Sequence, residues 1–159
     1  MMGFDGRQLR NAMGRFATGV CLITIYTEDR QPLALTANSF SSVSLDPPLV
    51  LWNLQNNSDV YADYARQRSF AINVLSSEQQ AMSNQYARKG QHVLDPAHFR
   101  PGSCGAPVIR NALVNLECEQ HVTLEAGDHL IIVGQIRNMH ERPNGKPLLF
   151  YAGGYGELR

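Results

Sequence analysis

The most chemically suggestive stretch of this chain is a run of nine small residues, from Thr36 to Ser44, in which six side chains carry a hydroxyl or an amide. Hydroxyls, amides and compact backbone N–H groups supply the donors and acceptors that a polar heteroaromatic ring or a phosphate needs. The run could bind such a ligand without a glycine-rich loop. A serine-rich loop at the edge of a β-structure is the competing interpretation, and the pattern alone favours it.

A second candidate is His129, which follows the turn residues Gly127 and Asp128 at the start of an apolar run. A histidine bonded to backbone at a strand start is the simpler explanation for it. No GxGxxG sequence follows a predicted strand, which argues against a Rossmann dinucleotide site. The histidines share no metal-ligand spacing and no CxxC occurs, so we expect no metal site.

Composition excludes several classes of protein. Lys plus Arg and Asp plus Glu each number 14, and a neutral chain lacks the basic surface that nucleic acids require. No apolar run approaches the length of a membrane span, and no secretory signal is visible, so we expect a cytoplasmic protein. Cys21 and Cys118 lie in apolar runs and are expected to be buried thiols, whereas Cys104 lies in a loop.

The elements that would position the candidate residues are mostly strands. Residues 113–124 alternate, with Val114, Leu116, Cys118, Val122 and Leu124 predicted to share the buried face. Asp5, Ser58 and Ser76 or Ser77 are expected to cap helices. We expect strands at 20–27, 32–36, 49–54, 70–75, 113–124, 129–136 and 147–151, and helices near 6–16, 59–66 and 77–88.

The order of these elements indicates the fold class. Crossover helices do not separate the strands regularly, which disfavours a parallel doubly wound sheet. The spacing predicts one domain spanning 1–159, an antiparallel barrel with helices at its ends. A long segment from Lys89 to Pro107 has no clear element of its own, and loops of that length are usually functional.

Several segments together resemble one protein family. Arg15 to Val20, Thr36 to Val50, Phe70 to Leu75, Gln85 to Ala87, Gly127 to His129, Pro147 to Leu149 and Gly153 to Tyr155 resemble the short-chain flavin reductases, in order along nearly the whole chain. These are reductase components of two-component flavin monooxygenases. The resemblance implies a mainly β, antiparallel Greek-key split β-barrel with a few short helices, forming a homodimer. It also implies FMN or FAD near the subunit interface, with NADH or NADPH as hydride donor.

The same resemblance implies roles for individual residues. Thr36, Asn38 and Ser39 would line the flavin ring, and His129 would lie beside the nicotinamide as the catalytic residue. Tyr155 could stack near the same site or simply cover the core. The remaining implied flavin-binding residues are Ala37, Ser41, Ser42, Ser44, Asp46, Pro47, Asn53, Ser58, Arg88 and Lys89.

Three other functions fit the same residues. The protein could keep its flavin as a fixed group and reduce another acceptor, such as a ferric chelate or a corrin. It could also bind flavin without catalysis, or be a structural barrel that binds none. The favoured hypothesis is an NAD(P)H-dependent flavin reductase that supplies reduced flavin to a partner monooxygenase, because hydride transfer between cofactors needs no strong protein acid or base.

Overall fold

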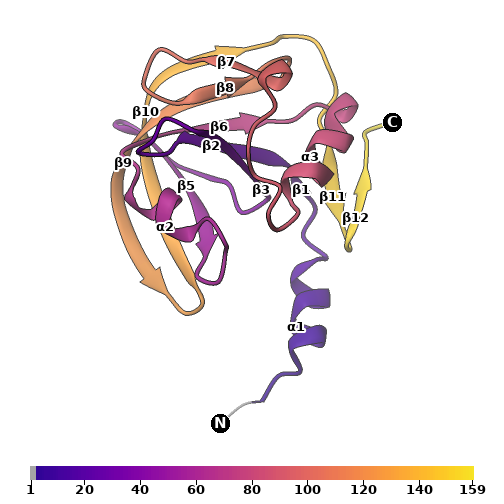
Figure 1. Ribbon diagram of the computed structural model, residues 1–159. Helices are drawn as coiled ribbons and strands as arrows, with labels where there is room; N and C mark the ends of the chain where they lie inside the picture. The colour runs from indigo at the N-terminus through magenta and orange to yellow at the C-terminus, as the bar shows by residue number, and fades with distance from the viewer. Residues whose placement is uncertain (1–2) are drawn as a thin grey trace.

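The computed structural model describes residues 3–159, which form a curved seven-stranded antiparallel sheet, two smaller sheets and short helices placed around them (Figure 1). The helices are α1 (Gly6–Met13), α2 (Tyr61–Arg66) and α3 (Gln80–Tyr86), with 3₁₀ turns η1 (Ser77–Gln79) and η2 (Pro96–His98). The strands are β1 (Thr18–Gly19), β2 (Cys21–Tyr26), β3 (Pro32–Ala37), β4 (Ser41–Leu45), β5 (Pro48–Gln55), β6 (Ser69–Val74), β7 (Phe99–Pro101), β8 (Pro107–Ile109), β9 (Val114–Ala126), β10 (His129–Glu141), β11 (Leu149–Tyr151) and β12 (Gly154–Gly156). The mainly β prediction is confirmed.

Seven strands form the main sheet in the order β3-β2-β6-β9-β10-β5-β4, and every neighbouring pair is antiparallel. The long β9–β10 hairpin curves around one side of the sheet, in orange in Figure 1, and α1 extends away from the body. Because β3 and β4 are the two edges, the crossing between them spans an open side of the sheet. Residues 38–40 of the polar run make that crossing, while the two ends of the run belong to β3 and β4.

Packing in the core determines which face of β5 each of its side chains occupies. Trp52 and Leu54 are fully buried, and the Trp52 ring meets the Tyr64 ring edge-on at a centroid distance of 5.7 Å. The Tyr64 hydroxyl donates to the Ile23 carbonyl oxygen at 2.6 Å, which fixes α2 to β2. Successive side chains of a strand point to opposite faces, so Asn53 and Gln55 must point away from this core.

Gly134 of β10 packs against the edge of the Phe70 ring in the core. A Cβ atom built on Gly134 would approach the Phe70 ring closer than any real contact allows, and would also crowd Cys118. The absence of a side chain at this position therefore lets β6, β9 and β10 pack around one phenyl ring.

Some local predictions are confirmed and others are wrong. Asp5 caps α1, accepting from the Arg7 N–H at 3.1 Å. Ser58 does not cap α2, because the helix begins two residues later than predicted, at Tyr61, and the Ser58 hydroxyl instead accepts from the Val60 N–H. The Gln79 side chain does accept from the Ser76 N–H at 3.0 Å, as the helix-start pattern predicts.

Two loop predictions also need correction. Residues 41–45 form a strand, β4, because they pair with β5 despite their small polar side chains. The segment 89–107 is not structureless: it carries η2 and β7, and β7 pairs with β8. In both places tertiary pairing overrides weak local propensity.

The alternation predicted for residues 113–124 fails in its second half. Val122 and Leu124, which were predicted to lie on the buried face, are exposed. The cause is a bulge: Val122 pairs with Val133 and Gln120 with Gly134, so His121 is an extra residue. An extra residue in a strand reverses which face the following side chains occupy.

The buried polar and sulfur groups behave as structural groups. Burial raises the pKa of the Cys21 and Cys118 thiols to about 12, as expected for buried thiols. The Asn73 amide is a satisfied core amide that bonds Leu22, Thr24, Ile109 and Asn115. Within residues 3–159, no helix has the length and apolarity of a membrane span.

Candidate functional site

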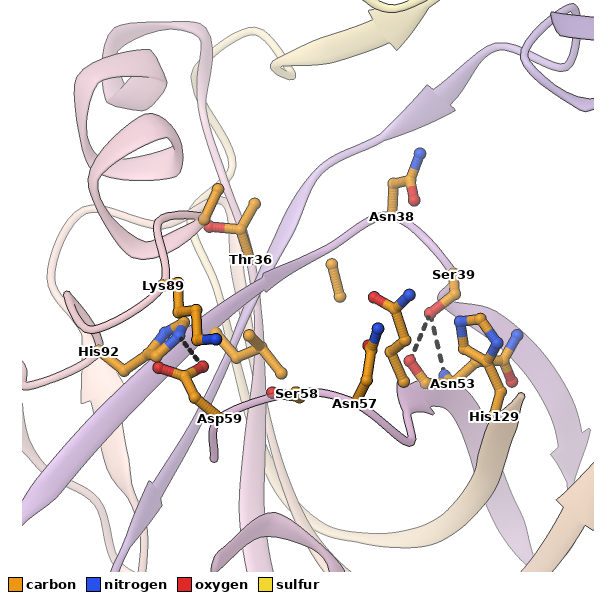
Figure 2. A pocket seen from close by; sticks show the side chains of 14 residues that line it. Thr36, Asn38, Ser39, Asn53, Asn57, Ser58, Asp59, Lys89, His92 and His129 are labelled. Carbon is orange, nitrogen blue, oxygen red and sulfur yellow. Dashed lines mark hydrogen bonds and ion pairs between the residues drawn. The ribbon is translucent and has the colours of Figure 1, made fainter. Parts of the chain in front are cut away.

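A polar cleft of about 530 Å³ opens at the edge of the sheet where β3 ends and β5 ends (Figure 2). Its walls come from the crossing between β3 and β4, from the segment that leads into α2, and from the segment that follows α3. The lining residues are Leu35, Thr36, Ala37, Asn38, Ser39, Asn53, Gln55, Asn57, Ser58, Asp59, Ala87, Lys89, His92 and His129. Most of these side chains are polar, so the cleft suits a ligand with many donors and acceptors.

Ser39 and Asn53 fix the right-hand end of the cleft in Figure 2. The Ser39 hydroxyl accepts from the Asn53 backbone N–H at 2.9 Å, which holds the crossing segment against β5. The Asn53 side-chain Oδ1 is buried and has no hydrogen-bond partner within residues 3–159. A buried acceptor without a partner is uncommon in folded proteins, and this one belongs to a residue that lines the cleft.

Thr36 connects the cleft to α3. Its hydroxyl donates to the Ser83 carbonyl oxygen at 2.7 Å, and the Ser83 hydroxyl bonds the Tyr155 hydroxyl at 2.7 Å. A second hollow of about 190 Å³ shares Thr36, Ala37 and Asn38 with the first, and Tyr155 lines this second hollow rather than the cleft. The segment 36–38 is therefore a common wall of the two spaces.

A histidine–carboxylate pair stands at the left-hand end of the cleft in Figure 2. His92 is buried, and its Nε2 lies 3.0 Å from Asp59 Oδ1, while its Nδ1 lies 3.1 Å from the Ala34 carbonyl oxygen. Asp59 Oδ2 accepts from the Gly90 N–H at 2.7 Å. Partial desolvation raises the pKa of Asp59, but the Gly90 bond and the nearby His92 lower it more, so the net pKa lies below the ordinary value.

A second pair, His129 with Asp128, lies at the other end. His129 Nδ1 is 2.7 Å from Asp128 Oδ1, and this hydrogen bond, with the charge of His129, holds the Asp128 pKa below its ordinary value. The turn is fixed to the end of β5, since the Asp128 carbonyl oxygen accepts from the Asn56 N–H at 2.9 Å. An ionised carboxylate only accepts, so Nδ1 carries a proton and Nε2 is left to face the surroundings.

The structure brings eight of the predicted site residues into one cleft: Thr36, Ala37, Asn38, Ser39, Asn53, Ser58, Lys89 and His129. It does not bring the others there. Ser41, Ser42 and Ser44 lie on edge strand β4, and Asp46 and Pro47 form the turn after it, because pairing with β5 carries this half of the run away from the cleft. Arg88 also lies outside the lining, and Tyr155 lines the neighbouring hollow.

Sequence reasoning missed several lining residues, above all Asp59 and His92. They are 33 residues apart and neither belongs to a recognisable motif, so only the fold pairs them. One weak signal existed: Asp59 directly follows Ser58, which was already a candidate. Within residues 3–159, no group of three metal-ligating side chains lies together.

Comparison with known proteins shows what this chain resembles. Residues 13–159 match the family model described as "Flavin reductase like domain". The FMN reductase (NADH) SmoA of Agrobacterium fabrum is 40% identical over 156 residues, 98% of this chain and 88% of that protein. A probable flavin reductase of Rhizobium meliloti is 41% identical over 96% of this chain, which spans only 49% of that longer protein.

Solved structures give the same result. BorF, the flavin reductase component of a bacterial two-component tryptophan halogenase, superposes with a TM-score of 0.88 at 34% identity, over 97% of this chain and 98% of that one. The NADH:FAD oxidoreductase SgcE6 of Streptomyces globisporus, in complex with NAD and FAD fragments, superposes with a TM-score of 0.90 at 32% identity, over 100% of this chain and 98% of that one. The split-barrel prediction is confirmed.

Proposed function

The chain belongs to the flavin reductase-like family, and from that premise we propose that the cleft between β3, β5 and the segment after α3 is its flavin site. The protein is an NADH-dependent flavin reductase that supplies reduced flavin to a monooxygenase. One observation carries the assignment of the cleft: Asn53 Oδ1 is a buried acceptor without a partner, on a residue that lines the cleft beside the polar crossing segment.

The groups present fit a flavin. The pyrimidine edge of an isoalloxazine ring carries an N–H and two carbonyl oxygens, so it needs both acceptors and donors. Asn53 Oδ1 supplies an unused acceptor, and the Asn38 amide, which lines the same cleft, supplies both kinds of group. At the other end, Lys89 takes part in no ion pair within residues 3–159, so its ammonium is available to a phosphate.

Bound flavin supplies the chemistry, because it accepts a hydride directly from NADH. The task of the chain is therefore to bind and orient. Ser39 holds the crossing segment at a fixed distance from β5, so the ring edge meets preset partners. His129, with its Nδ1 proton committed to Asp128, presents Nε2 toward the same space, where it would orient the nicotinamide carboxamide or hold a proton near the ring.

The subunit arrangement and the partner extend the proposal. We infer a homodimer, because α1 buries none of its residues and exposes Leu9 and Met13, while Phe16, just after it, is 80% exposed. Val122 and Leu124 near the tip of the β9–β10 hairpin are exposed as well. Apolar side chains of this size are costly to leave in water, so a second copy is a fitting cover for them. The partner oxygenase would receive reduced flavin by diffusion.

The first test is NADH oxidation, followed at 340 nm in air with added FMN or FAD. We expect rapid oxidation that depends on added flavin. Asn53→Ala should raise the flavin KM about 10-fold, since a hydrogen bond to a buried acceptor contributes about 1–1.5 kcal/mol. Asn144→Ala, in an exposed turn outside the cleft, is the matched control and should leave KM unchanged. Equal behaviour of the two variants would remove the cleft as the flavin site.

A further inference from the structure

The ring of His92 has a hydrogen-bond partner at each of its two nitrogens. Its Nδ1 faces the Ala34 carbonyl oxygen at 3.1 Å, and a carbonyl oxygen can only accept. Its Nε2 faces Asp59 Oδ1 at 3.0 Å, and the lowered pKa of Asp59 keeps that carboxylate ionised at neutral pH. Each ring nitrogen therefore faces an oxygen, and the ring is fixed in orientation from both sides.

Hydrogen bonds with Ala34 and Gly90 hold this pair in place. The Ala34 N–H donates to the His92 carbonyl oxygen at 2.8 Å, so His92 is fixed to β3 by its backbone and by its ring. Asp59 comes from the segment before α2. Its second oxygen accepts from the Gly90 N–H at 2.7 Å, which joins a residue 31 positions later in the chain.

Gly90 is the residue directly after Lys89, and its backbone has φ +78°, a conformation that glycine adopts most readily. Because Asp59 holds the Gly90 N–H, it also fixes the turn from which the Lys89 side chain reaches into the cleft. Figure 2 shows Lys89, His92 and Asp59 together at one end of the cleft. In the part of the chain that the structure describes, Asp59 forms no ion pair with the Lys89 ammonium, so its link to Lys89 runs through the backbone.

We propose that Asp59 and His92 are positioning residues, which hold the Lys89 turn in place so that the Lys89 ammonium meets the phosphate of the flavin. The proposal rests on the proposed function of the cleft. The charge of Asp59 makes the direction of the change in flavin affinity a test of the proposal. Asp59 is an anion near a site for another anion. Simple electrostatics would predict tighter flavin binding when Asp59 is removed, whereas positioning predicts weaker binding.

The test is a double-mutant cycle on the full-length protein, with Asp59→Ala, Lys89→Met and the double variant, in steady-state assays with FMN and NADH. We expect Asp59→Ala to raise the FMN KM about 10-fold with kcat changed less than twofold, because the Lys89–phosphate contact is a binding interaction. In the Lys89→Met background, Asp59→Ala should raise KM no further. If the rise in the FMN KM of the double variant equals the product of the two single rises, the proposal is wrong. It is also wrong if Asp59→Ala lowers the FMN KM.

Two further variants separate positioning from folding and from charge. Asp59→Asn retains an oxygen for the Gly90 N–H and keeps a polar amide beside His92 Nε2, so it should keep the FMN KM within about threefold of wild type. Asp63→Ala removes the same charge from α2 without touching Gly90 and should leave KM unchanged. If Lys89→Met alone leaves the FMN KM unchanged, Lys89 does not bind the phosphate. That result differs from a cycle in which both single variants raise KM and their effects multiply.

Discussion

The two ends of the cleft each carry a histidine–carboxylate pair, yet the pairs are built differently. Asp59 and His92 are 33 residues apart, and His92 is only 5% exposed, with both ring nitrogens bonded. Asp128 and His129 are neighbours in the chain, and Asp128 is 87% exposed. Buried, fully bonded groups hold structure in place, while an exposed pair with one free ring nitrogen can respond to a ligand. The difference suggests that the Asp59–His92 pair supports the fold and that the Asp128–His129 pair contacts the substrate.

The largest expected effect is on stability at the buried end. His92→Leu removes both ring hydrogen bonds and leaves the partly exposed Asp59 carboxylate without its partner, which should cost about 2 kcal/mol. Urea denaturation should show this loss in the free energy of unfolding. His140→Leu, at an exposed position of β10, is the control and should change stability little. A loss below about 0.5 kcal/mol for His92→Leu would mean that the buried pair is not structural.

At the exposed end the expected effect is kinetic. His129→Ala should slow flavin reduction about 10-fold, the value of one lost hydrogen bond to the reacting partner, with the flavin KM within about threefold. Stopped-flow reduction by NADH measures the rate directly. Asp128→Asn should slow the same step less and leave Tm within about 2 °C, because an exposed pair adds little stability. Unchanged reduction in His129→Ala would remove its assigned role.

The smallest effect concerns pH. The folded-state pKa of Asp59 lies below its ordinary value, so the carboxylate contributes stability above pH about 4, and this contribution is lost as pH falls through the folded pKa. Asp59→Asn should be less stable than wild type by about 1 kcal/mol at pH 7, and the gap should close in acid. Thermal melts between pH 3 and pH 7 compare the two proteins. A gap that stays constant with pH would show that ionisation of Asp59 is not involved.

The sequence was enough for the strands of the core and for half of the site. The β-branched runs and the Asp5 cap act through local chemistry, so they could be predicted. The half of the polar run that becomes β4 could not, because its structure comes from pairing with β5 and not from its own residues. The Asp59–His92 pair is likewise created by tertiary structure, and the bulge at His121 reverses a pattern that sequence alone reads as continuous.

Gly134 sets a limit on how freely this scaffold can be redesigned. Even alanine at this position of β10 would place a methyl group too close to the Phe70 ring of β6 and to Cys118 of β9. In a mutational library, we expect this central position to tolerate almost no residue except glycine unless Phe70 is made smaller in the same variant. Directed evolution of the cleft is therefore better aimed at the residues of its walls than at the sheet that supports them.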